Sequence, residues 1–293
     1  MSGELFSEER SAEVVAASFA GTPDPRLRQV LTSLVRHLHD FAKDVELTEA
    51  EWEAAIGFLT ETGQTCTPTR QEFILLSDVL GLSMLVETIN HRTGGTATES
   101  TVLGPFHMVA SPVRELGDDI ALDGKGTPCL VSGQVTGPDG APLAGATVDV
   151  WQTNEDGFYD VQQPDLQPAG NLRGIFTTDD DGRFWFRSVV PRYYPIPDDG
   201  PVGRLLAATA RHPNRPAHLH FIAAAEGFRP VTTHVFVADS PYLDSDAVFG
   251  VKDSLVRDVP EVDDPARAAE VGLANPFRTL TFDLSLLPAV SDQ

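Results

Sequence analysis

Cysteine is nearly absent from this chain of 293 residues, which contains only Cys66 and Cys129. Two isolated cysteines provide neither a disulfide framework nor a cysteine-based zinc site. Positive charge is also scarce, because 21 lysines and arginines face 43 acidic residues and give a formal net charge of −22. This charge argues against binding to nucleic acid or to anionic membranes, and it favours a neutral ligand over an anionic one.

Long apolar segments are missing as well. The sequence has no run of 18 apolar residues that could span a bilayer. Its first ten residues lack the basic segment followed by an apolar segment that is typical of a secretory signal. We therefore expect a cytoplasmic protein. The apolar content of 41% is ordinary for a globular protein, and the length allows one large domain or two.

Residues 1–100 are predicted to form a helical domain. Apolar residues recur at intervals of three and four between 27 and 41, which is typical of an amphipathic helix. Thr48 with Glu51 has the spacing of a capping box and predicts a second helix over 48–58. Thr69 with Glu72 repeats this spacing before a third predicted helix over 73–89. The third helix is apolar around most of its circumference, so we expect it to be buried on more than one side, between domains or between subunits.

Residues 101–293 are predicted to form an antiparallel β-sandwich, which makes the fold mainly β with an α-helical N-terminal region. Short strand-like runs alternate with turns rich in Gly, Pro and Asp. The expected strands are 129–136, 146–152, 175–178, 183–189, 218–223, 232–237 and 279–286. An irregular segment with four prolines, 191–201, precedes the strand 218–223. Irregular loops on a rigid sandwich are where functional sites are commonly built.

The strand 218–223 carries the main chemical signal, two histidines that alternate with apolar residues. Successive side chains of a strand point to opposite faces, so His218 and His220 share one face. Two imidazoles side by side on a rigid element form half of a metal site. The pattern alone does not decide the matter, because most histidines of this kind are ordinary polar positions.

Tyrosines add to this signal. The chain has only four, and Tyr159, Tyr193 and Tyr194 all lie in the 60 residues before the histidine strand. Tyrosine binds a metal as phenolate, whereas the free phenol has a pKa of about 10, so binding at neutral pH requires a strong Lewis acid. Phenolate oxygen prefers a hard cation and imidazole suits iron, whereas zinc usually takes Cys, His and carboxylates. A zinc hydrolase is therefore a weaker alternative to a ferric site.

Three motifs follow one another along the chain, WQTNEDGFY at 151–159, YPIPDDGPVG at 194–203 and RPAHLH at 215–220. In this order they resemble the motifs of intradiol ring-cleavage dioxygenases of the catechol 1,2-dioxygenase type. The resemblance covers almost the whole chain, including STVLGPF at 100–106. The segments VTTHVF at 231–236 and SPYLDSDAVFGVK at 240–252 look most like the hydroxyquinol 1,2-dioxygenase branch.

The resemblance implies one Fe(III) per chain. The implied ligands are Tyr159, Tyr194, His218 and His220. Tyr194 is preferred over Tyr193 because it matches the Pro-x-x-Tyr pattern that starts at Pro191. This tyrosine would leave the metal when substrate binds and take one of its protons. Arg215 would stabilise negative charge on the ring carbon that O2 attacks. His234 stands where catechol-specific relatives commonly carry glutamine, and it would either act in catalysis or merely pack.

The implied reaction belongs to aromatic compound catabolism. A small aromatic diol or triol, hydroxyquinol (benzene-1,2,4-triol), would be cleaved by O2 between its adjacent hydroxylated carbons to 3-hydroxy-cis,cis-muconate or maleylacetate. Catechol and chlorocatechols are the alternative substrates. The implied substrate-binding residues are Leu75, Asp78, Val102, Leu103, Gly104, Ile196, Pro197 and Arg215. Asp78 lies on an otherwise apolar side of the predicted helix 73–89, where it would accept a hydrogen bond from the third hydroxyl; a salt bridge or a cap is its other interpretation.

The resemblance also implies a homodimer that pairs through the N-terminal helices, with a phospholipid at their junction. A different class of protein remains open, because GAPLAGATVDV at 140–150 also resembles non-enzymatic transthyretin-like sandwiches. Both interpretations share a sandwich, so the fold does not separate them. The two tyrosines, Arg215 and the histidine pair favour the enzyme.

Overall fold

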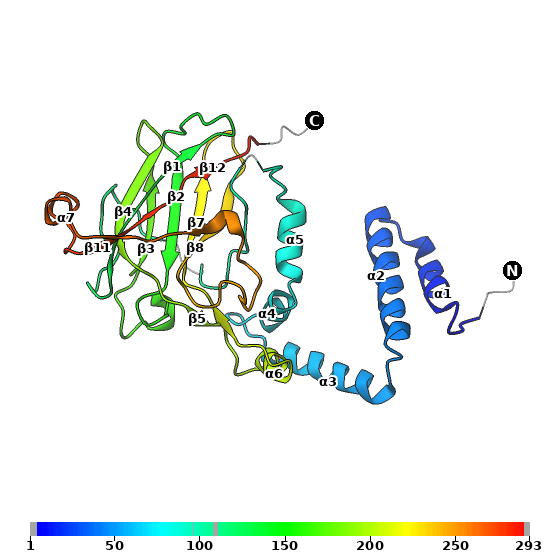
Figure 1. Cartoon of the computed structure of the whole chain (residues 1–293). Helices are drawn as coiled ribbons and strands as arrows, with labels where there is room; N and C mark the ends of the chain where they lie inside the picture. Colours follow the sequence, from blue (N-terminus) through cyan, green and yellow to red (C-terminus); the bar gives the residue numbers. More distant parts are fainter. Residues whose placement is uncertain (1–4, 96, 108–110, 290–293) are drawn as a thin grey trace. The chain divides into compact units, whose positions relative to one another are not determined.

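The computed structural model describes residues 5–95, 97–107 and 111–289, which are drawn as a ribbon in Figure 1. The chain separates into two units, Met1–Gln64 and Thr65–Gln293. Part of the region that we expected to be one helical domain, namely residues 65–100, thus belongs to the unit that contains the sandwich. Among the described residues no helix is both long and apolar enough to cross a membrane.

The first unit is helical. It contains α1 (Ser11–Ser18), a short 3-10 helix (Phe19–Gly21), α2 (Pro25–Asp44) and α3 (Glu49–Thr65), whose last residue belongs to the second unit. Asp24 caps α2 by accepting hydrogen bonds from the backbone of Arg26 and Leu27. The predicted capping box of α3 is confirmed, because Glu51 accepts from the Thr48 backbone at 2.9 Å and Thr48 Oγ1 accepts from the Glu51 backbone at 3.3 Å. The apolar stripe of α2 is 44–55% exposed at Leu27, Val30, Leu34, Leu38 and Phe41.

The predicted helix 73–89 is wrong as a single helix. The structure has two, α4 (Glu72–Val79) and α5 (Leu82–Asn90), separated at Gly81. Gly81 has a φ of +73°, a left-handed conformation that glycine adopts easily and that commonly ends a helix. The expected burial is also absent within the single chain, since seven apolar side chains of this region are 48–64% exposed. They are Phe73, Ile74, Leu80, Leu82, Leu85, Val86 and Ile89.

The second predicted capping box is wrong as well. Gln71 precedes α4 without any side-chain cap. Glu72 is fully buried and instead accepts a hydrogen bond of 3.1 Å from the backbone of Val202, in the first turn of α6 (Pro201–Ala208). A carboxylate at this place accepts a hydrogen bond from an N–H group that has no partner within the helix, and it is stabilised by the positive end of the helix dipole. Arg70 binds both Glu72 and Asp199, so α4 is fastened to the loop before α6.

The two sheets of the sandwich have five strands each. The first contains β1 (Pro128–Thr136), β4 (Arg183–Val189), β10 (Glu261–Val262), β11 (Phe277–Thr281) and β12 (Leu284–Ser285). The second has the order β3 (Arg173–Thr177), β2 (Thr147–Gln152), β7 (His218–Ala224), β8 (Val231–Val237) and β9 (Val256–Arg257). β5 (Tyr194–Pro195) pairs with β6 (Asn214–Arg215) outside both sheets.

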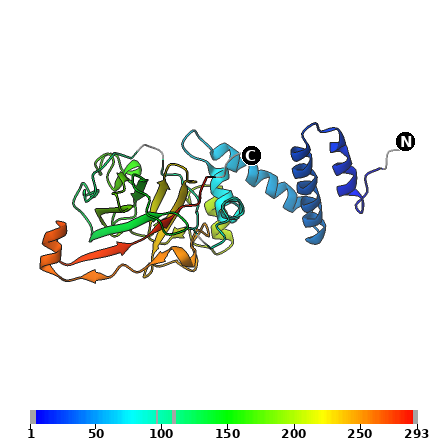
Figure 2. The same ribbon diagram turned by 90° about the horizontal axis from the view of Figure 1, so that it is seen from above.

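The sandwich is confirmed, but its sheets are mixed rather than purely antiparallel. β1 runs parallel to β11 and β12, and β8 runs parallel to β9. The predicted strand 279–286 is divided into β11 and β12. Helix α7 (Pro265–Val271) lies at the end of this unit that is farthest from α4 and α5, as both views show (Figures 1 and 2).

The core between the sheets positions the histidines. Leu219 and Phe221 of β7 are buried in the main apolar cluster, together with Val148 of β2 and Phe186 of β4. Because side chains alternate along a strand, the other side chains of β7 lie on the outer face of the second sheet. That face carries the site described below.

Replacing Glu72 by alanine tests the link between α4 and α6. We expect Glu72→Ala to lower the free energy of unfolding by about 2–3 kcal/mol, because Arg70 and the Val202 N–H lose a buried acceptor. Asp199→Ala is the matched control, since its side chain is 72% exposed and its ion pair should contribute under about 1 kcal/mol. Denaturant unfolding of both variants gives the comparison. Equal losses in the two would show that Glu72 has no special role.

Candidate metal centre

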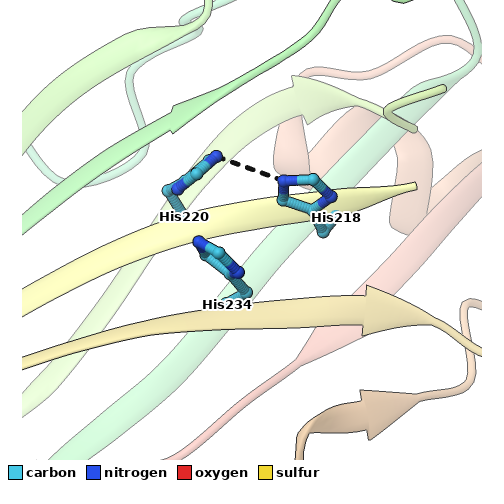
Figure 3. Close-up of side chains that lie close together, drawn as sticks. All are labelled: His218, His220 and His234. Carbon is cyan, nitrogen blue, oxygen red and sulfur yellow. Dashed lines mark hydrogen bonds between the residues drawn. The ribbon is translucent and has the colours of Figure 1, made fainter. Parts of the chain in front are cut away.

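Three buried histidines cluster on the outer face of the second sheet (Figure 3). His218 and His220 come from β7, and His234 comes from β8, directly opposite His220 in the strand register. The Nε2 atoms of His218 and His220 lie 3.2 Å apart. One ring nitrogen from each of the three histidines lies within 4.8 Å of the others. The alternation of β7 therefore places both of its histidines in one cluster.

Two tyrosines complete this cluster. The hydroxyl of Tyr159 lies 2.8 Å from His220 Nε2 and 3.3 Å from the hydroxyl of Tyr194. Both tyrosines are buried; Tyr159 follows β2 and Tyr194 forms the start of β5. Tyr193 lies elsewhere, because its ring packs against Tyr242 at 5.2 Å between centroids. The structure thus brings together two phenol oxygens and two imidazole nitrogens.

This donor set fits a metal ion better than a purely hydrogen-bonded network. His218 Nδ1 donates to the carbonyl of Pro216 at 2.7 Å, which leaves its Nε2 as a lone pair directed at the cluster. That lone pair faces His220 Nε2 at 3.2 Å, and His220 Nε2 lies 2.8 Å from the hydroxyl oxygen of Tyr159. Oxygen and imidazole donors without a thiolate suit a hard cation or iron. The residues that could hold such an ion are Tyr159, Tyr194, His218 and His220.

Burial sets the protonation of these groups. It lowers the pKa of His218 to about 3, with a further contribution from the charge of Arg215. It also holds the pKa of His220 and of His234 well below the usual range, reinforced by the neighbouring histidines. Burial raises the pKa of Tyr159 well above that of a free phenol, and Tyr194 adds to this shift. The imidazoles are therefore neutral and ready to bind a cation, whereas Tyr159 keeps its proton until a cation replaces it.

Arg215 lies directly beside this cluster. Its Nη1 is 3.3 Å from His218 Nε2, and its Nη2 is 3.5 Å from His234 Nδ1. The β5–β6 pairing sets Arg215 opposite Tyr194. Two further contacts join Arg215 to Asp246, Nε to Oδ1 at 3.1 Å and Nη2 to Oδ2 at 3.2 Å.

Sequence reasoning missed Asp246. It is 5% exposed, and burial alone would raise its pKa, but the charge and hydrogen bonds of Arg215 outweigh burial and lower it. No spacing in the sequence links position 246 to position 215. The only available signal was general, because a buried arginine requires an acidic partner.

The segment 101–107 covers part of the cluster. Gly104 has a φ of +78°, and a Cβ atom there would lie 3.1 Å from Cε1 of His220, so no larger residue fits easily. The ring of Phe106 stacks on Tyr159 at 4.5 Å between centroids. Thr101 is buried and Val102 is partly buried, whereas Leu103 is 44% exposed. This segment is thus in place to form one wall of a binding site.

The remaining predicted substrate residues come from α4 and from the loop after β5. Ile196 is buried in a second apolar cluster, against which Leu75 packs, whereas Pro197 is exposed. Asp78 is partly buried, and burial raises its pKa, while a hydrogen bond with Ser83 and the charge of Arg215 oppose the shift. Asp78 therefore lies close enough to Arg215 for their charges to interact.

Comparisons with known proteins give consistent results. A protein-family model described as "Dioxygenase" matches residues 108–288, and one described as "Catechol dioxygenase N terminus" matches residues 24–98. The chain is 57% identical over 270 residues to the hydroxyquinol 1,2-dioxygenase of Rhizobium sp. (strain MTP-10005), and the match covers 92% of each protein.

Two solved structures complete the comparison. The hydroxyquinol 1,2-dioxygenase of Pseudomonas putida DLL-E4 is 50% identical with a TM-score of 0.90, covering 96% of this chain and 99% of the other. The catechol 1,2-dioxygenase of Pseudomonas arvilla C-1 is 32% identical with a TM-score of 0.79, covering 96% and 91%.

Proposed function

The chain belongs to the intradiol ring-cleavage dioxygenases, and on that premise we propose that it cleaves hydroxyquinol with O2 between the two adjacent hydroxylated carbons. The product would be 3-hydroxy-cis,cis-muconate or its tautomer maleylacetate. The observation that carries this proposal is the meeting of two tyrosine oxygens and two histidine nitrogens beside Arg215. Hydroxyquinol is favoured over catechol because the relatives named for hydroxyquinol are 57% and 50% identical, against 40% and 32% for two relatives named for catechol.

We propose that one Fe(III) per chain is held by Tyr159, Tyr194, His218 and His220. When bound, the ferric ion would polarise and orient the dihydroxylated ring and O2. Tyr159 is the more firmly held tyrosine, because it is fully buried and its backbone N–H donates to Gln162 Oε1 at 2.9 Å. Tyr194 lies in a strand of two residues next to an irregular loop. Its phenolate oxygen is therefore the group that would take one substrate proton.

Arg215 and His234 are the proposed catalytic residues beside the ligands. Arg215 is a permanent cation, and in a buried site its field would stabilise negative charge on the reacting ring carbon. His234 Nδ1 faces the guanidinium of Arg215 at 3.5 Å, so this nitrogen is the acceptor and the proton resides on Nε2. His234 also makes a hydrogen bond with the backbone of Val102, so its Nε2–H group would exchange this partner in order to donate to substrate or O2.

Iron binding is tested by His220→Ala. We expect this variant to lose both iron and the red colour that phenolate-to-Fe(III) charge transfer gives, because one of four ligands is removed. Metal analysis and the visible spectrum of the purified protein measure the two properties. Tyr193→Phe is the matched control and should keep both, since Tyr193 packs against Tyr242 outside the cluster. Stoichiometric iron in His220→Ala would contradict the proposed ligands.

Asp78 is the proposed reader of the third hydroxyl. Its charge interacts with that of Arg215, and it follows Leu75 along α4, one turn further on. Leu75, Ile196, Pro197 and the segment 102–104 would form the rest of the substrate site. Catechol lacks the third hydroxyl, so with catechol the partly buried carboxyl group of Asp78 would lose one hydrogen bond and keep only the one with Ser83.

Oxygen uptake with hydroxyquinol, catechol and chlorocatechols tests both the activity and this reader. The parent should prefer hydroxyquinol. In Asp78→Ala, the ratio of kcat/KM for hydroxyquinol to kcat/KM for catechol should fall roughly tenfold to a hundredfold, the effect of about 1–3 kcal/mol. Asp78→Asn keeps a hydrogen-bonding side chain and should lose less. Iron content is measured in every variant. An unchanged ratio in iron-loaded Asp78→Ala would remove Asp78 from substrate recognition, and no uptake by the iron-loaded parent would overturn the proposed activity.

We also propose a homodimer that pairs through the N-terminal helices, with a phospholipid among their apolar side chains. Two exposed apolar surfaces support it, the stripe of α2 and the side chains Leu82, Leu85, Val86 and Ile89 of α5. Exposed apolar area of this extent commonly marks an interface or a lipid site. The cytoplasmic location that we expect from the sequence stays a prediction.

Light scattering tests the dimer. The parent should have about twice the chain mass of 31.6 kDa at micromolar concentration. Leu34→Glu combined with Leu38→Glu should shift it to the monomer mass, because charge is placed on the α2 stripe. Arg36→Glu, on the opposite side of the helix, is the control and should remain dimeric. A monomeric parent contradicts the dimer, and mass spectrometry of an organic extract shows whether a phospholipid is bound.

A further inference from the structure

The loop 244–250 holds the partner of Arg215 in one position. Asp246 accepts hydrogen bonds from the backbone N–H groups of Gly250 at 2.9 Å and Val248 at 3.3 Å, in addition to its two contacts with Arg215. Both carboxylate oxygens are therefore shared between the guanidinium and the loop's own backbone. A carboxylate fixed in this way presents its oxygens in one orientation only.

The loop is itself fastened to the strand that carries Arg215. Ala247 N–H donates to the carbonyl of Asn214 at 3.2 Å, one residue before Arg215. Arg211 donates to the carbonyl of Ala247 at 2.9 Å and to the carbonyl of Val79, at the end of α4, at 2.6 Å. Hydrogen bonds thus connect this loop both to the strand of Arg215 and, through Arg211, to the end of the helix that carries Asp78.

Gly250 leaves the space that the guanidinium occupies. A Cβ atom at this position would lie 2.8 Å from Arg215 Nη2 and 3.1 Å from Asp246 Oδ2. Nη2 is the atom that faces both Asp246 and His234. Any side chain at 250 would therefore push the guanidinium away from its present contacts.

We propose that Asp246 and Gly250 are positioning residues that aim the guanidinium of Arg215 at the metal centre, an inference that rests on the proposed function. Asp246 takes two of the guanidinium's three nitrogens, Nε and Nη2, which directs Nη1 toward His218 and Nη2 toward His234. Asp246 also balances the charge of Arg215, so the pair can be buried without an uncompensated ion. Neither residue needs to touch substrate for this role.

Two variants disturb Arg215 in different ways. Asp246→Asn removes the negative charge and one acceptor, whereas Gly250→Ala keeps both charges and displaces the guanidinium by crowding. Each should lower kcat for hydroxyquinol by roughly tenfold to a hundredfold, within the range lost when a positioned electrostatic group is removed. Iron content, visible colour and KM should change little, because the four ligands are untouched. Asp246→Glu restores the charge and should recover part of kcat.

Two control variants and a double-mutant cycle separate a positioning role from a general loss of structure. Asp244→Asn changes an exposed carboxylate on the same loop, and Gly57→Ala adds a methyl group where no atom lies within 4 Å; both should match the parent. Arg215→Lys combined with Asp246→Asn should be no slower than Arg215→Lys alone, since Asp246 acts through Arg215. Additive losses, or an unchanged kcat in Asp246→Asn, would overturn the proposal.

A crystal structure of Asp246→Asn provides a measurement that does not depend on activity. We expect the guanidinium of Arg215 to rotate away from His218 and His234 while the histidine cluster keeps its geometry. An unmoved guanidinium would count against the proposal even if the parent proved inactive on hydroxyquinol. If Asp246→Asn does not fold, Gly250→Ala and Asp246→Glu carry the same comparison. Inactivity of the parent, by contrast, is a failure of the proposed function alone.

Discussion

The alternation of side chains along β7 is the constraint on which the site depends. Leu219 and Phe221 are buried in the core between the sheets, so His218 and His220 must lie on the opposite face. A shift of one residue in the register would place both imidazoles in the apolar core and both apolar side chains at the metal centre. Hydrophobic burial of Leu219 and Phe221 thereby fixes the face on which the histidines lie, and the contact between His218 and His220 follows from it.

Buried ion pairs then fix the groups that β7 does not carry. Arg215 is set by Asp246, as described above. On the other side of the cluster, fully buried Arg173 binds Asp160 at 2.6 Å, and Asp160 directly follows Tyr159. Arg173 also donates to the carbonyl of Phe106, whose ring stacks on Tyr159. Breaking such a pair leaves one buried charge uncompensated, which costs about 3–5 kcal/mol. Each ion pair thus stabilises one orientation of the site residues beside it.

The sequence was sufficient to predict the alternation of side chains along a strand. It was not sufficient to predict the backbone conformation of a single glycine or the contacts between segments that lie far apart in the chain. Strand alternation was sufficient to place His218 and His220 together. The helix over 73–89 was expected to be continuous because its apolar residues continue past Gly81, and composition does not show that this glycine is left-handed. Glu72 has the spacing of a cap for its own helix, yet it caps α6, which lies 130 residues further along the chain. Asp246 has no local pattern at all, since its role exists only once the loop 244–250 meets β6.

Opposite pKa shifts set the charge of the groups at the buried site. Burial disfavours every charged form, so it lowers the pKa of the histidines and raises that of Tyr159. His218, His220 and Tyr159 are then neutral, and Arg215 with Asp246 adds no net charge. The excess of negative charge on the chain therefore lies outside the site. A cation must displace the phenol proton of Tyr159 in order to bind its oxygen, so metal affinity should rise with pH.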